Sequence, residues 1–105
     1  MRTARQDRLG VVAAHFVRGA AAQMRLEVES AIHCFGCGSS LGVRHHLTSL
    51  RRLAERRARI ERNLLHTSSA AARLRRAADA ALLALEGGSP ARVARALRRV
   101  EALTQ

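Results

Sequence analysis

The stretch "EGGSPARVARALRRVEAL", residues 86–103, indicates how the chain ends and how it folds back on itself. Its two adjacent glycines can adopt the left-handed backbone conformation that ends a helix. Ser89 followed by Pro90 is typical of the start of another helix. Beyond the proline, apolar residues recur every three or four positions, as they do on one face of a helix. We therefore predict a helix over about 90–103 that packs antiparallel against the preceding one.

Upstream of this stretch, apolar residues repeat with heptad spacing over about 43–85. One set comprises Val43, Leu50, Leu64, Ala71, Ala78 and Leu85, and the second comprises Leu53, Ile60, Leu74 and Ala81. Arg57 and Thr67 interrupt the pattern, but "HTSSAAA" over 66–72 contains neither glycine nor proline. We therefore favour one long helix over about 47–86 to two helices. At 1.5 Å per residue it would span roughly 60 Å, which suggests an extended molecule or a homodimer.

Residues from about 3 to 32 are expected to form an N-terminal helix, since Leu9, Val12, Phe16 and Ala20 fall on one helical face. The segment "MRLEVESAI", residues 24–32, also alternates between apolar and polar residues, which allows a short β-hairpin at 24–35. We favour helix here because a lone strand has no evident partner in so short a chain.

The segment "HCFGCGSSLGVRHH", residues 33–46, is expected to be a glycine- and cysteine-rich break between helices. Three glycines and two serines within residues 36–42 predict irregular backbone there. The chain of 105 residues is therefore expected to form one small all-α domain over 1–105. Its architecture would be a helical bundle or a long helical hairpin.

The charge of the chain is strongly positive, at +11, and all 19 of its basic residues are arginines. A surface with this charge attracts polyanions, and the planar guanidinium group suits phosphate recognition. Within "RRLAERRARIER", residues 51–62, six of the twelve residues are arginines, and the C-terminal helix adds more. The residues expected to contact phosphate are Arg51, Arg52, Arg56, Arg59, Arg95, Arg98 and Arg99. The other interpretation is a solvated helix face with Arg51–Glu55 and Arg57–Glu61 ion pairs.

The break also holds residues that can bind a metal ion. Cys34 and Cys37 have the spacing of two thiolate ligands, and His45 and His46 are candidates to complete a tetrahedral zinc site. Adjacent histidines diverge on a helix, so a site shared by two chains would fit this spacing better. Two unligated thiols or a redox pair are the alternatives.

Several classes of function and location lack support in the sequence. We expect no enzyme, because no nucleophile, base and orienting group form a recognisable set. No apolar run is long enough for a membrane helix. Asp7, His15 and Arg18 interrupt the outline of a secretory signal at the N-terminus, so we expect a cytoplasmic protein.

Two hypotheses about function follow. The first is a small basic protein that binds nucleic acid, or acts as a regulatory accessory factor, through its arginine-rich helix. The alternative is a protein–protein interaction module, such as an adaptor, chaperone or secretion-system subunit, whose heptad face 43–85 binds a partner helix. The first predicts binding that weakens steeply with salt, and the second predicts little binding to nucleic acid.

Overall fold

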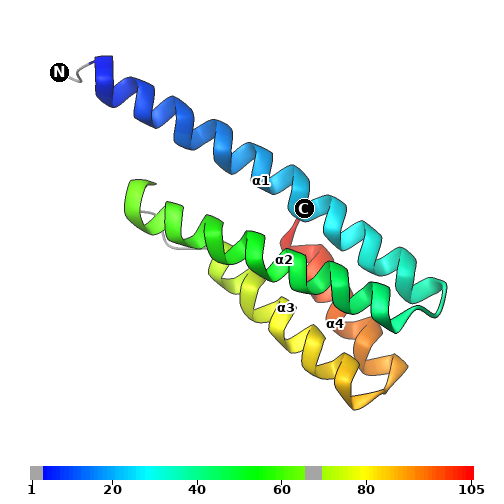
Figure 1. Cartoon of the computed structure of the whole chain (residues 1–105). Coiled ribbons are helices and arrows are strands. Elements are labelled where there is room, and N and C mark those ends of the chain that lie inside the picture. The colour runs from blue at the N-terminus through cyan, green and yellow to red at the C-terminus, as the bar shows by residue number, and fades with distance from the viewer. Residues whose placement is uncertain (1–3, 66–69) are drawn as a thin grey trace.

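The computed structural model describes residues 4–65 and 70–105, with side chains over 21–63 and 70–105. Every regular element in these residues is a helix, so the all-α class is confirmed (Figure 1). The elements are α1 (Ala4–Gly36), α2 (Ser40–Ile60), the π-helical segment η1 (Glu61–Leu65), α3 (Ala70–Gly87) and α4 (Pro90–Leu103). The four α-helices pack together as a bundle with principal extents of 55 × 20 × 18 Å.

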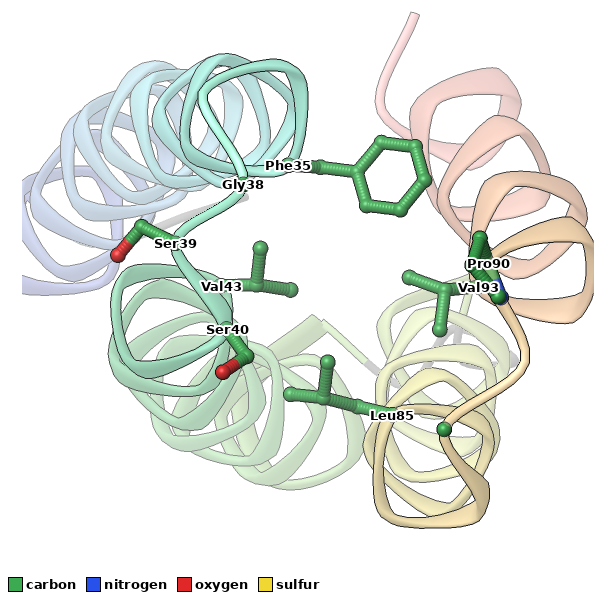
Figure 2. Close-up of a pocket in the computed structure, with 9 residues that line it drawn as sticks. Phe35, Gly38, Ser39, Ser40, Val43, Leu85, Pro90 and Val93 are labelled. Atoms are coloured by element: carbon green, nitrogen blue, oxygen red, sulfur yellow. The ribbon is translucent and has the colours of Figure 1, made fainter.

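The helices alternate in direction, and each lies beside the next along the chain (Figure 1). Helix α1 packs against α2 and α4, and α3 packs against the same two helices. Within the described residues, no Cα atom of α2 lies within 8 Å of a Cα atom of α4, so the two helices occupy diagonal corners of the bundle (Figure 2). The outer surfaces of α2 and α4 therefore face in opposite directions.

The core follows the apolar spacing of each helix. It runs through all four α-helices, and its largest fully buried side chains are Met24, Leu47, Leu50, Val28, Val43 and Val100. Burying a side chain such as Leu or Val stabilises the fold by about 1.5–3 kcal/mol. Alanines at 31, 54, 78 and 81 are fully buried but remove less surface from water. The heptad positions thus pack against one another within one chain.

The first turn is much shorter than the sequence predicted. Helix α1 continues to Gly36 rather than ending near 32, and only residues 37–39 separate it from α2. Gly38 has φ of 77°, and the Ser39 hydroxyl accepts the backbone N–H of Gly42, which caps α2. The break predicted over 33–46 is therefore present but confined to residues 37–39, and the β-hairpin considered at 24–35 is wrong. Residues 24–36 and 40–46 are helical because their apolar residues face the bundle core.

The predicted single long helix over 47–86 is also wrong. Helix α2 gives way to η1 at Glu61, and α3 begins at Ala70 and returns along α2. Folding back lets the heptad positions of both helices share one core, which a single extended helix cannot do. The side chain of Leu64 and residues 66–69 lie outside the described residues.

The turn between α3 and α4 confirms the helical hairpin predicted from the sequence. Helix α3 ends at Gly87, Gly88 adopts φ of 75°, and α4 covers Pro90–Leu103. Ser89 occupies the N-cap position, although its side chain makes no capping hydrogen bond. Helix α4 packs antiparallel on α3 through Val93, Leu97 and Val100.

Two further predictions concern membrane-spanning helices and the apolar face of the N-terminal helix. No helix among the described residues is both long enough and apolar enough to cross a membrane. The side chains of Leu9, Val12, Phe16 and Ala20, which are predicted to share one helical face, lie outside the described residues.

Candidate nucleic-acid interface

Three of the predicted arginines form a basic surface on the outside of α2. Arg52, Arg56 and Arg59 are spaced at i, i+4 and i+7, and all three are exposed. A helix turns once every 3.6 residues, so they lie on the side opposite to Leu50 and Ala54, which face the core. None of the three has an ion-pair partner among the described residues. We call Arg52, Arg56 and Arg59 the α2 face.

Arg51 differs from these three because it lies at the seam between α2 and α3. Its Nη1 atom is 3.5 Å from Oδ1 of Asp79, and the neighbouring Glu55 lies 3.9 Å from Arg75. The predicted Arg51–Glu55 pair is therefore replaced by two pairs between helices. All four side chains are more than a third exposed, so each pair contributes little to stability. Their effect here is to neutralise part of the charge of Arg51.

Arg57 points toward the interior and takes no part in the outer surface. Its Nε donates to Oε1 of Glu61 at 2.9 Å, which confirms the predicted i,i+4 pair. The Glu61 residue is only 6% exposed, and its second oxygen, Oε2, has no hydrogen-bond partner. Burial of a carboxylate requires a compensating charge, which Arg57 supplies.

A second basic surface lies on α4. Arg95, Arg98 and Arg99 are exposed, while Val93, Leu97 and Val100 on the same helix face the core. As on α2, no carboxylate in the described part of the chain pairs with them. We call Arg95, Arg98 and Arg99 the α4 face. Because α2 and α4 are diagonal, the predicted arginines form two separate surfaces and not one.

The charge balance of the described residues favours attraction of anions. Of the carboxylates, Glu27, Glu55, Glu61 and Asp79 are engaged within the bundle, which leaves Glu29, Glu86 and Glu101. Six further exposed arginines have no ion pair with the described residues and were not among the predicted contacts: Arg25, Arg44, Arg62, Arg73, Arg76 and Arg92. The sequence shows an excess of arginine over acidic residues, but this excess does not indicate which arginines are exposed and unpaired.

The four predicted metal ligands are not gathered in one place. Cys34 is partly buried, and a Cβ built on Gly42 would lie 2.5 Å from its Sγ, whereas Cys37 is exposed. The Nε2 atom of His33 lies 3.7 Å from the Sγ atom of Cys37. His46 is instead directed at α1, where its Nδ1 lies 2.8 Å from Oε2 of Glu27.

No group of three or more metal-binding side chains occurs among the described residues. His45 is exposed and contacts the ring of His46 edge-on, with 5.0 Å between ring centroids. A zinc site shared by two chains thus stays a prediction. Metal analysis of the wild-type protein and of the Cys34→Ser, Cys37→Ser double variant tests it. Equal zinc content in the two proteins contradicts the prediction.

Sequence reasoning did not find the apolar hollow at the end of the bundle where both turns lie. It has a volume of about 320 Å³, and Phe35, Val43, Leu85 and Val93 point into it from four different helices (Figure 2). None of its nine lining residues carries a side chain that titrates near neutral pH, and its polar side chains are the hydroxyls of Ser39 and Ser40. No local sequence pattern predicts it, because its residues come from all four helices.

Fold and surface together define a class: an all-α four-helix bundle that carries a basic face on each of two diagonal helices. Comparison of the chain with protein-family models, with curated proteins and with solved structures gives no match.

Proposed function

We propose that this protein binds duplex nucleic acid through the phosphate backbone, using the three arginines of the α2 face and the three arginines of the α4 face. The observation that carries the proposal is the set of exposed guanidinium groups on each surface that have no carboxylate partner within the described chain. A guanidinium group that is not neutralised in the folded protein remains available for phosphate oxygens.

The regular spacing of the α2 face supports a backbone interaction. At 1.5 Å per residue, Arg52 and Arg59 lie about 10 Å apart along the helix axis, so three cations follow one another along a straight line. Phosphate contacts of this kind position a protein on nucleic acid without reading its sequence. The proposal is therefore for binding with little sequence preference.

Duplex is a better partner than single strands for this surface. Proteins that hold single strands stack the bases on aromatic side chains. The chain has only two phenylalanines, and Phe35 points into the apolar hollow.

The proposal also places the protein in the cytoplasm, where Cys34 and Cys37 would remain thiols.

The interaction-module alternative loses its proposed surface. Val43, Leu50, Leu74, Ala78 and Ala81 on the heptad face are buried in the protein's own core. The homodimer depended on one helix of roughly 60 Å, and α2 and α3 fold back on each other instead. We therefore propose neither the interaction module nor the homodimer.

A binding titration with matched variants tests the function. Affinity for a short DNA duplex is measured by fluorescence anisotropy at several salt concentrations, for the wild type and for a variant with glutamine at six positions. These positions are Arg52, Arg56, Arg59, Arg95, Arg98 and Arg99. We expect binding that weakens steeply with salt and is lowered in the variant by at least about tenfold more than in the control.

The control variant has the same net charge but keeps both faces. It carries glutamine at Arg25, Arg44, Arg62, Arg73, Arg76 and Arg92, which are also exposed and have no ion pair among the described residues. No detectable affinity of the wild type at about 150 mM salt contradicts the proposal. Equal losses in the two variants would mean that net charge alone, and not the two faces, attracts the nucleic acid.

A further inference from the structure

The two basic faces lie on opposite sides of the molecule. Within the described residues, α2 and α4 have no Cα atoms within 8 Å of each other, and α1 and α3 lie between them on either side (Figure 2). Arg52, Arg56 and Arg59 point away from the core on one corner, and Arg95, Arg98 and Arg99 do so on the diagonal corner. One flat or convex surface cannot contact both faces.

The faces are also displaced along the bundle axis. Both α2 and α4 begin at the end of the bundle where the two turns lie (Figure 2). The α2 face lies 12 to 19 residues beyond Ser40, which is about 18–28 Å along its helix. The α4 face lies 5 to 9 residues beyond Pro90, about 8–14 Å along its helix.

Surfaces that carry less positive charge separate the two faces on the α1 side. The exposed residues of α1 there include Leu26, which is 61% exposed, the carboxylate of Glu29, and a single arginine, Arg25, beside Leu103. On α3 the half nearer to the turns exposes Leu83 and Glu86, whereas Arg73 and Arg76 lie in the other half.

A short duplex cannot wrap around the bundle to reach both faces. The bundle is 20 × 18 Å in cross-section, whereas the persistence length of DNA is about 150 base pairs. A duplex of about 30 base pairs therefore behaves as a straight rod on this scale. A rod seated on the α2 face leaves the α4 face free for a second one.

We propose that one copy of the chain bridges two duplex segments, with the α2 face on one and the α4 face on the other. This inference rests on the proposed function, and it adds that the protein joins separate stretches of nucleic acid rather than coating one. The partner of each face is the phosphate backbone of a duplex, recognised by three guanidinium groups.

A two-duplex capture experiment tests the bridge. One duplex of about 30 base pairs is tethered to beads, and a second, fluorescent duplex of equal length is free in solution. Protein is added at low salt, and both the protein and the fluorescence retained on the beads are measured. The variants are R52Q/R56Q/R59Q on the α2 face, R95Q/R98Q/R99Q on the α4 face, and R25Q/R73Q/R76Q as a control with the same loss of charge.

We expect the wild type and the control variant to retain the second duplex to within about a factor of two of each other. Each single-face variant should still bind the tethered duplex but retain at least about fivefold less of the second. Far-UV circular dichroism confirms that each variant is folded. An alanine series at the same positions, which favours helix, replaces any glutamine variant that unfolds.

Two results would overturn the bridge and leave the proposed function in place. The wild type could bind the tethered duplex and retain none of the second. Single-face variants could also bridge as well as the wild type does, as expected if two copies associate and each binds one duplex. Failure of the wild type to bind the tethered duplex at all would instead overturn the proposed function, and the bridge with it.

Discussion

At the residue scale, Gly42 allows α1 and α2 to approach each other closely. A Cβ atom at this position would lie 2.5 Å from Cys34 Sγ and 3.0 Å from Cys34 Cβ. Alanine is the better helix former, by roughly 0.5–1 kcal/mol. Overpacking costs about 1–3 kcal/mol, however, because the partner has little freedom to move. The closeness of two helices here thus depends on the absence of one methyl group.

We predict that Gly42→Ala lowers the free energy of unfolding by about 1 kcal/mol, measured by urea denaturation. Gly19→Ala is the matched control, because nothing lies within 4 Å of a Cβ at that position of α1. It should leave stability unchanged or raise it by about 0.5 kcal/mol. In a Cys34→Ala background the cost of Gly42→Ala should fall by about half or more. An undiminished cost there would contradict the contact.

The Arg57–Glu61 pair is asymmetric in its burial, and this asymmetry has measurable consequences. The Arg57 side chain is 24% exposed and reaches water, whereas the Glu61 side chain is 8% exposed. Removing the arginine therefore leaves a buried carboxylate without a counter-charge, but removing the glutamate leaves a cation that can still be solvated.

We predict that Arg57→Met lowers the free energy of unfolding by about 2–3 kcal/mol, and Glu61→Met by roughly half as much. The double variant should be less destabilised than Arg57→Met alone, because no charge remains buried. Chemical denaturation of the three variants measures this difference. The order would be reversed if the carboxylate were in fact well hydrated.

At the element scale, the turn between α3 and α4 depends on one left-handed residue. Gly88 has φ of 75°, a conformation that costs other residues about 1 kcal/mol or more. Gly87, one residue earlier, is the last helical residue of α3, and a Cβ there would meet nothing within 4 Å. Gly88 therefore stabilises the turn through its left-handed backbone conformation, whereas Gly87 has no such role.

We predict that Gly88→Ala lowers the melting temperature by about 4–8 °C, as expected for a loss of about 1 kcal/mol in a chain of this size. Gly87→Ala serves as the control and should change it by less than about 2 °C. Thermal denaturation followed by circular dichroism gives both values. Similar shifts for the two variants would show that the left-handed conformation is not what stabilises the turn.

At the scale of the whole molecule, the diagonal placement of α2 and α4 limits how many cations one duplex can meet. If one face of three arginines contacts one short duplex, the slope of log K against log salt should be about −2.7. Contact of all six arginines with the same duplex would give about −5.4. A salt titration with the duplex limiting distinguishes the two values, and the steeper slope would contradict separate faces.

The sequence by itself determined the helical class, the C-terminal helix and its turn, and the excess of positive charge. These follow from local rules: the spacing of apolar residues, the backbone freedom of glycine, the fixed φ of proline and the count of ionisable groups. Arg52, Arg56 and Arg59 could be placed on one helical face for the same reason. The break predicted over 33–46 is longer than the turn in the structure, because Gly42 does not disrupt a helix but lies inside α2 against Cys34.

Only the tertiary structure decided that α2 and α3 are separate helices, that α2 and α4 are diagonal, and that His46 bonds to Glu27 rather than lying beside the cysteines. Heptad spacing is the same for a helix that packs on another chain and for one that folds back on its own. The choice depends on burying the apolar faces of all four helices together. That packing also separates the basic faces, because the order of helices around a core is not written in any local stretch of sequence.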